Sequence, residues 1–206
     1  MTNTKNVKDS TLYITQVAML IAIELVMRVL GLGNVPVGPL NMSFMTVPTA
    51  IGAILLGPLA GVILGGVFGL TSFWDALSGK SVMTGTFLQL SPVNTFILCV
   101  VMRMLMGLCT ALIYRAVKKI DPTKVVRYFI GAICAPLLNT FFFMGFICLV
   151  FYNTEYIQNL VTKLGVSNPI AFVIALVGTQ GLVEAVVCAV VGGLVAKGVS
   201  LALKLG

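Results

Sequence analysis

Four charged side chains interrupt otherwise apolar stretches of the sequence, and they are the residues best placed to do chemistry. Glu24 and Arg28 lie in the first stretch, Arg103 in the fourth and Glu184 in the last. At the centre of a bilayer, a charged side chain costs at least about 2.5–3.5 kcal/mol and therefore needs a partner or a function. Arg103 can bind an anion, or it can pair with Glu24 or Glu184. Arg28 can pair with Glu24 one helical turn away, or extend to the outer interface.

Uncharged polar side chains form a second group of candidates. Asn139 and Gln180 lie within apolar stretches, where an unpaired amide is costly, so each either bonds helices together or contacts a ligand. Glu184 is expected to be a structural partner. The candidate substrate-binding residues, chosen by their predicted position towards the outer face, are Arg103, Asn139, Gln180, Asn94, Asn41, Trp74 and Gln89.

Several classes of catalytic site are excluded by residue type. The sequence has no His, so it cannot form a Ser-His-Asp triad or a His-ligated zinc site. Its six acidic residues are scattered, and its five cysteines lie in apolar runs without a CxxC pair, as packing residues do. Ser78–Ser81 ends like a phosphate-binding loop, but Trp74 occupies the position of the required glycine. We expect no enzyme, no metal, no disulfide and no cofactor.

These residues belong to a membrane protein. The chain has 206 residues, 59% of them hydrophobic and only 9% charged, whereas a soluble domain has roughly 25% charged residues. A spanning helix needs about 20 apolar residues. The sequence therefore predicts one all-α transmembrane domain over 1–206, with a polar N-terminal tail (1–11) and six helices at about 12–32, 43–56, 58–74, 93–114, 128–154 and 170–195. Residues 75–91 are expected to form a loop with at most a re-entrant or interfacial piece.

Charge predicts the orientation of these helices. If both termini and the 115–127 loop share one side, that side holds nine Lys and Arg residues, and the other side holds only Lys80 and Lys163. Excess positive charge stays on the cytoplasmic side. Both termini are thus expected inside, with the loops near 33–43, 75–92 and 155–169 outside. The net charge of +7 then reports topology and not nucleic-acid binding.

Small residues recur at intervals of four, which places them on one helix face. Ala18 and Ala22 do so in the first helix, and Gly61 and Gly65 in the third. Such faces let helix backbones approach closely in lipid. They can pack within the chain or dock a separate membrane subunit, and we assign these four residues to docking.

The chain resembles the substrate-binding S-component of energy-coupling factor (ECF) vitamin transporters. The resemblance rests on six predicted helices with both ends inside, on Ala18 and Ala22, and above all on the run GAILLGPLAG at 52–61. Among these proteins, the sequence looks most like the pantothenate-type members. The resemblance implies a subunit that binds a vitamin with high affinity at an outward-facing pocket. It implies docking on a transmembrane coupling subunit and two ATPase subunits. It also implies that this chain lies in the bacterial plasma membrane.

Other functions remain open at this stage. The vitamin can instead be riboflavin, which favours stacking aromatics such as Trp74 or Tyr152, or folate or cobalamin, which need a larger pocket. A standalone membrane facilitator would not need ATPase subunits. An integral membrane enzyme would need clustered carboxylates or a nucleophile with a base, and the sequence shows neither.

Overall fold

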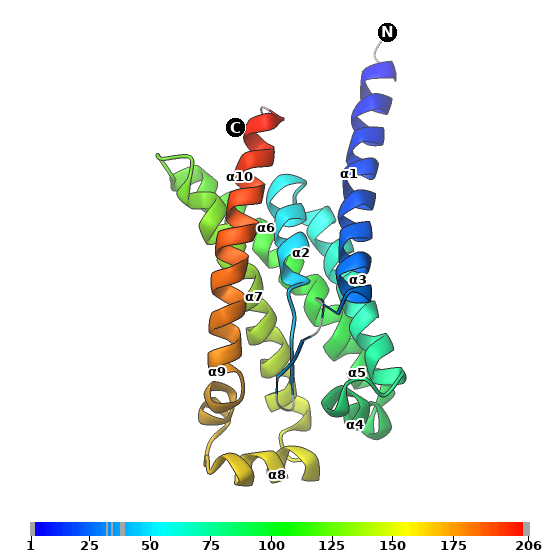
Figure 1. Ribbon diagram of the computed structural model, residues 1–206, viewed down its shortest axis with the longest axis vertical. Coiled ribbons are helices and arrows are strands. Elements are labelled where there is room, and N and C mark those ends of the chain that lie inside the picture. The colour runs from blue at the N-terminus through cyan, green and yellow to red at the C-terminus, as the bar shows by residue number, and fades with distance from the viewer. Residues whose placement is uncertain (1–2, 32, 34, 38–39, 204–206) are drawn as a thin grey trace.

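The chain folds into an elongated bundle of helices that carries one short hairpin (Figure 1). The computed structural model describes residues 3–31, 33, 35–37 and 40–203, and it describes the side chains of residues 10–31, 33 and 43–203. The elements in chain order are α1 (Asn3–Val29), β1 (Val35–Val37), β2 (Leu40–Met42), α2 (Thr46–Leu55), α3 (Pro58–Leu77), α4 (Val82–Leu90), α5 (Pro92–Phe96), η1 (Ile97–Val101), α6 (Met102–Ile120), α7 (Val126–Phe146), η2 (Ile147–Phe151), α8 (Glu155–Leu164), α9 (Pro169–Val187), η3 (Cys188–Gly192) and α10 (Gly193–Ala202).

Long apolar helices confirm the prediction of a helical bundle and are typical of a membrane protein. Among the described residues, five segments are long and apolar enough to cross a bilayer, namely Ser10–Val29, Pro58–Leu77, Pro92–Ile120, Val126–Phe151 and Pro169–Ala202. The last three each contain a π-helical segment, η1, η2 or η3. Helix α2 is apolar but has only 10 residues, or about 15 Å at 1.5 Å per residue, half of a hydrocarbon core. Six complete spans therefore stay a prediction.

The turn between α2 and α3 lies where the sequence places it. Helix α2 ends at Leu55, and α3 begins at Pro58. Gly57 has φ 92°, a left-handed conformation that glycine adopts without a steric cost. Proline suits the first position of a helix because its missing N–H has no helical partner there. The short turn holds α2 against α3.

Three segments contain more regular structure than the sequence predicts. The N-terminal tail expected at 1–11 is helical from Asn3 onwards, and the loop expected at 75–91 contains α4. The polar segment after α7 contains α8, which has Glu155 in its first turn, Lys163 in its last turn and Gly165 in a left-handed conformation just after it. This distribution of charge suits a helix dipole, and the glycine ends the helix.

The core of the bundle depends on close contact between α3 and α6. A Cβ atom added to Gly61 would overlap the carbonyl oxygen of Gly107 in α6, and one added to Gly69 would lie 2.6 Å from the Cα atom of Val100 in η1, which precedes α6 directly. Only glycine permits two backbones to approach this closely. Such close packing can hold helices together in lipid, where no hydrophobic effect drives their association. Around the contact, Phe68 and Leu64 are fully buried. This arrangement fixes the first turn of α6, which carries Arg103, against α3.

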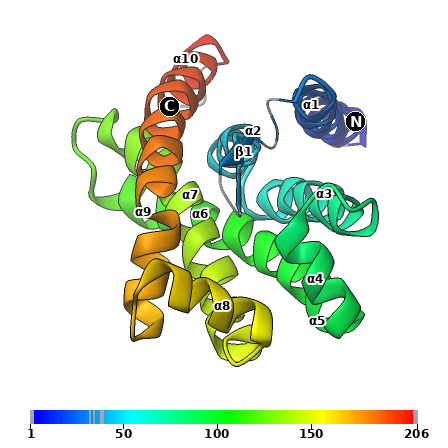
Figure 2. The same cartoon turned by 60° about the horizontal axis from the view of Figure 1, so that its bottom comes forward.

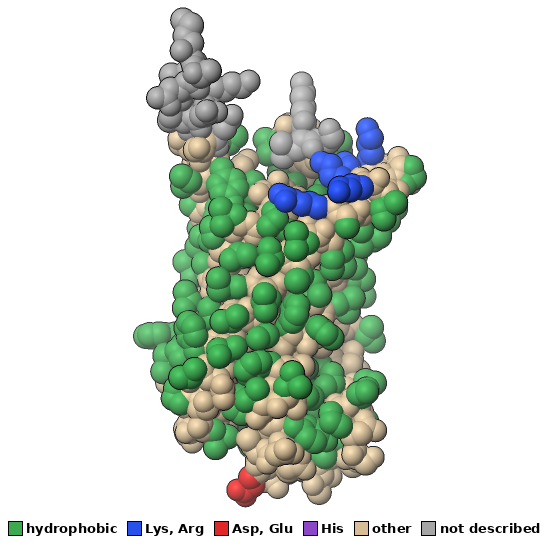
Figure 3. Space-filling model, turned by 180° about the vertical axis from the view of Figure 1, so that it is seen from behind, with side chains coloured by type: hydrophobic (Ala, Val, Ile, Leu, Met, Phe, Trp, Pro, Cys, Tyr) green, Lys and Arg blue, Asp and Glu red, His purple; other side chains and the backbone are tan. Residues whose placement is uncertain are grey.

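The arrangement of the elements gives the bundle two different ends. Both described ends of the chain and the connection between α6 and α7 lie at one end, and α4, α8 and the hairpin lie at the other (Figure 1). In the tilted view, α2 lies between α1 and α10, which it contacts (Figure 2). Figure 3 shows apolar side chains along the height of one face and Lys and Arg side chains gathered at the end with the termini. This surface suits a bilayer with a basic rim on one side.

Candidate functional site

A polar cavity lies among α3, α4, α6, α7 and α9. Of these helices, α4 lies at the end of the bundle away from the termini (Figure 1). The cavity encloses about 60 Å³, which at about 10–15 Å³ for each water corresponds to roughly five waters. A vitamin needs more room, so the walls must move apart when one binds. The lining residues are Ser43, Ser72, Asp75, Ser81, Met83, Thr84, Arg103, Asn139, Thr140, Phe143, Met144, Val177, Gln180, Gly181 and Glu184.

Arg103 supplies a buried positive charge to this cavity. Its side chain is only 7% exposed, and its guanidinium carbon lies 4.4 Å from the ring centroid of Phe68 and 5.0 Å from that of Phe143. Nη1 donates a hydrogen bond to the carbonyl oxygen of Cys99 at 2.9 Å, and Nε has no hydrogen-bond partner among the described residues. None of the described carboxylates forms an ion pair with Arg103. A buried guanidinium without a carboxylate partner favours an anion in the cavity.

Glu184 lines the same cavity from α9 and is 4% exposed. Its Oε1 atom accepts a hydrogen bond from the backbone N–H of Ser43 at 2.7 Å and one from Nε2 of Gln180 at 3.4 Å. The expected role as a structural partner is met through these contacts and not through Arg103. Pairing of Arg103 with Glu24 or Glu184, one of the two roles left open for the arginine, does not occur among the described ion pairs.

Amides and hydroxyls complete the polar wall. Asn139 on α7 and Gln180 on α9 line the cavity together with Arg103, so three of the seven predicted binding residues converge. The Oδ1 atom of Asn139 and the hydroxyl of Thr84 are buried and have no hydrogen-bond partner among the described residues. Such atoms are costly unless a ligand or water satisfies them. The wall therefore offers a cation and neutral polar groups to a ligand.

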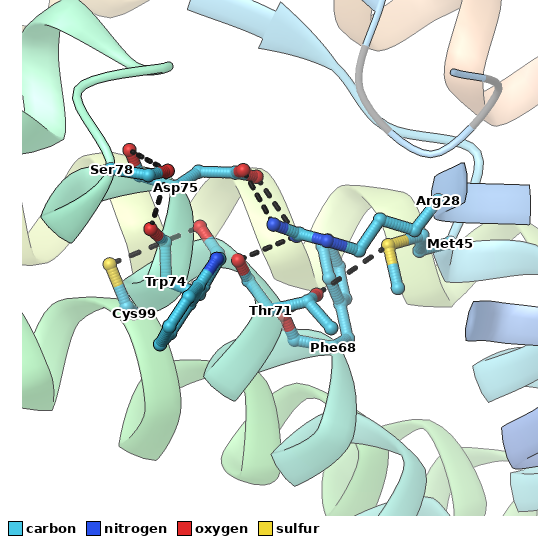
Figure 4. Close-up of polar contacts among 9 residues, drawn as sticks. Arg28, Met45, Phe68, Thr71, Trp74, Asp75, Ser78 and Cys99 are labelled. Atoms are coloured by element: carbon cyan, nitrogen blue, oxygen red, sulfur yellow. Dashed lines mark hydrogen bonds and ion pairs between the residues drawn. The ribbon is translucent and has the colours of Figure 1, made fainter. Parts of the chain in front are cut away.

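Arg28 is paired with Asp75 (Figure 4). Pairing with Glu24, one of the two roles left open for Arg28, does not occur among the described ion pairs. The Nη2 and Nη1 atoms of Arg28 donate to the two carboxylate oxygens of Asp75 at 2.6 and 3.0 Å, and Nη1 also donates to the carbonyl oxygen of Thr71 at 2.6 Å. A bidentate pair of this kind fixes geometry as well as charge. Because Asp75 also lines the cavity, this bond ties the end of α1 to the cavity wall.

Glu24 lies apart from this pair, fully buried between α1 and α2. Its Oε1 atom accepts a hydrogen bond from the hydroxyl of Thr49 at 2.7 Å, whereas Oε2 has no hydrogen-bond partner among the described residues. Glu24 thus belongs to the packing of α1 on α2 and not to the cavity.

The other predicted binding residues do not reach the cavity. Trp74 is 63% exposed on α3, and Gln89 is exposed on α4. Asn94 is half-buried on α5, but it is not among the described residues of the wall. These three residues were chosen only by their predicted position along the membrane normal, and they lie on helix faces that do not line the cavity. The side chain of Asn41 lies outside the described residues.

Of the fifteen described residues that line the cavity, the selection from sequence missed twelve, Asp75 and Ser43 among them. Asp75 stands in a segment expected to be a loop, and Ser43 lies between the hairpin and α2. Asp75 directly follows the uncharged apolar run of α3. An acidic residue at the end of such a run could have indicated a candidate cavity residue. Ser43 bonds to Glu184 through its backbone N–H. Because every residue except proline has this group, the identity of the side chain does not indicate the contact.

The residues assigned to docking divide into two pairs. Ala18 and Ala22 are exposed on α1, as a docking face requires. Gly61 and Gly65 are buried, because α3 packs there against the backbone of α6, so their assignment to a partner is corrected to packing within the chain. An apolar groove of about 710 Å³ also runs between α1, α2 and the last helix. Its described lining includes neither alanine.

Comparison with known proteins gives one family match. Residues 12–195 match the model of the family described as "ECF transporter, substrate-specific component". This segment contains every described residue of the cavity wall and the exposed alanines of α1. Among curated proteins, no significant match is found.

Proposed function

The chain belongs to the family of substrate-specific components of ECF transporters, and on this premise we propose that it binds a vitamin, pantothenate, in the polar cavity around Arg103. Members of this family are transporter subunits, and the long apolar helices make this one a multi-pass membrane protein. The proposed role is high-affinity binding at the outer face for an ATP-driven uptake complex.

The observation that carries the proposal is the buried guanidinium of Arg103, which forms no ion pair with any described carboxylate. Pantothenate is a carboxylate with hydroxyls and an amide. Its carboxylate can accept charge-assisted hydrogen bonds from Arg103, which lose little to water in a buried site. Its amide N–H or a hydroxyl can donate to Oδ1 of Asn139, and a hydroxyl can bond to Thr84. Arg103, Asn139 and Thr84, which each have a buried polar atom without a described hydrogen-bond partner, would then gain a contact with the ligand.

The aromatic residues argue against riboflavin. Trp74 is exposed and lies outside the described cavity wall. Tyr152 packs edge-on against Phe172, with ring centroids 6.3 Å apart, and is likewise not part of that wall. Folate or cobalamin would require a much greater expansion of a cavity of about 60 Å³.

The exposed face of α1 is the proposed docking surface for the energising module. The family implies such a module, and we infer a transmembrane coupling subunit with two ATPase subunits. Ala18 and Ala22 would let a partner helix approach the backbone of α1 closely. Leucine at both positions should abolish copurification with the module and leave vitamin binding by the isolated chain unchanged. Loss of binding with assembly intact would contradict this role.

The basic end of the bundle supports a cytoplasmic location of both termini in the bacterial plasma membrane. Arg115, Lys118, Lys119 and Lys124 lie in or beside the connection between α6 and α7, and the Lys and Arg side chains in Figure 3 gather at that end. Positive residues in short loops favour the cytoplasmic side. The cavity would then lie in the outer half of the membrane.

The identity of the ligand tests the proposal. The chain is purified from cells grown in rich medium, and small molecules released by denaturation are identified by mass spectrometry. Pantothenate should be enriched over a mock purification, and added pantothenate should bind the emptied protein. Enrichment of a neutral vitamin, with no binding of pantothenate, would contradict the proposed substrate.

A further inference from the structure

The cavity wall carries two opposite charges that do not touch. Arg103 lies on α6 and Glu184 on α9, and both side chains are more than nine-tenths buried. Both line the cavity, yet no ion pair joins them among the described residues. Keeping two buried charges apart costs free energy unless something between them interacts with both. A ligand with two unlike polar groups would do so.

We propose that Glu184 determines specificity by accepting a hydrogen bond from a hydroxyl group of the substrate, whose anionic group binds Arg103. The substrate class is then an organic acid that also carries a hydrogen-bond donor. This inference rests on the proposed function and adds a second recognition point to it. It also assigns a ligand contact to a residue expected from sequence to be structural.

The carboxylate of Glu184 is fixed in place for such a contact. Both of its described hydrogen bonds, from the backbone N–H of Ser43 and from Nε2 of Gln180, end on Oε1. Within the part of the chain that the structure describes, Oε2 accepts none. One oxygen is therefore held by the protein and the other is left for the cavity that Glu184 lines. An acceptor held in this way loses little entropy when it binds a donor.

Arg103 is likewise held by contacts of its own. Its Nη1 atom is bonded to the carbonyl of Cys99, and its guanidinium lies against the rings of Phe68 and Phe143. The arrangement rejects two kinds of ligand. A simple fatty acid would leave Glu184 without a donor, and a dicarboxylate would place a second negative charge beside it.

The test uses purified protein, pantothenate and an analogue in which both hydroxyls are replaced by hydrogen. In Glu184→Gln, the amide oxygen can still accept from Ser43, but an NH₂ group replaces the oxygen that faces the ligand. Pantothenate should bind this variant roughly tenfold or more weakly, because a hydrogen bond to a charged group is lost. The deoxy analogue should bind the variant and the wild type within about twofold. Glu155→Gln, on the exposed surface of α8, is the matched control and should bind pantothenate like the wild type.

Each outcome separates this inference from the proposed function. If Glu184→Gln binds pantothenate like the wild type, the inference is wrong and the proposed function stands. An equal loss for pantothenate and the deoxy analogue would show that Glu184 acts only through packing, which also overturns the inference. If the wild type does not bind pantothenate, the proposed vitamin is wrong. The ligand extracted from the protein then decides, because a ligand that lacks either the acid or the donor contradicts the inference.

Discussion

Gly65→Ala should weaken substrate binding although Gly65 does not contact the cavity. A Cβ atom at this position would overlap the carbonyl oxygen of Arg103 and lie 2.9 Å from its carbonyl carbon and 3.2 Å from the Cα atom of Met104. All three atoms belong to the backbone of α6, so no rotamer change can make room. Helix α6 must move away from α3, and the Arg103 side chain must move with it.

The expected size of the effect follows from two opposing contributions. Overpacking costs about 1–3 kcal/mol, whereas alanine is favoured over glycine inside a helix by about 1 kcal/mol. The net loss of stability should therefore be between about 0 and 2 kcal/mol. Displacement of Arg103 should remove much of a charge-assisted hydrogen bond, so the Kd for pantothenate should rise roughly tenfold.

Gly66→Ala is the matched control on the neighbouring residue. A Cβ atom there would lie 3.6 Å from Cγ of Met104, an ordinary van der Waals contact, so this variant should be as stable as the wild type or more so, and it should bind normally. Thermal unfolding in detergent and calorimetric titration with pantothenate measure both properties. If Gly65→Ala binds like the wild type, close packing of α3 on α6 does not position Arg103.

Three further predictions concern the rest of the chain. A cysteine at Lys163, on a Cys-free background, should react with a membrane-impermeant reagent in intact cells, and one at Lys119 should not; the reverse pattern would invert the topology. Glu24→Gln should change the free energy of unfolding by less than about 1 kcal/mol, because the amide oxygen can still accept the hydrogen bond from Thr49; a larger loss would mean that the charge of the carboxyl is needed. The hydrogen bond from Thr123 lowers the pKa of Asp121 below its usual 3.8, so the ionised form stabilises the fold. That stabilisation should be complete above about pH 4 and lost as the pH falls through the lowered pKa. Wild type and Asp121→Asn should therefore differ in melting temperature at pH 7 and converge in acid, and a difference that persists in acid would refute this.

The sequence predicts the helices better than it predicts their contacts. Apolar length alone located the long spans, and the Gly57–Pro58 turn followed from backbone preferences. Helix α8 was not recognised, although Glu155, Lys163 and Gly165 form a start and stop pattern around it. With 10 residues, some of them polar, α8 is too short to span a membrane. A search for membrane spans therefore treats this segment as a loop.

Partners of charged residues could not be read from the chain. For Arg28, the only partner that the sequence suggested was Glu24, four positions away, whereas its partner is Asp75, 47 positions away. A spacing of four reports a shared helix face, but it does not show which neighbouring helix covers that face. The glycine face of α3 was misassigned for the same reason, because a partner helix and α6 demand the same small residues at Gly61 and Gly65.

Arg103 tests the central claim most directly, with Arg127 as its control. Both side chains are nine-tenths or more buried and both lie against an aromatic ring, but Arg127 stands at the start of α7, at the basic end of the bundle. The measurement is the Kd of pantothenate for Arg103→Gln and Arg127→Gln at matched helix content. We predict a loss of roughly tenfold or more for Arg103→Gln only, since a hydrogen bond to a charged group contributes about 1.5–3 kcal/mol. Normal binding by Arg103→Gln, or an equal loss in both variants, would contradict the assignment of the substrate site.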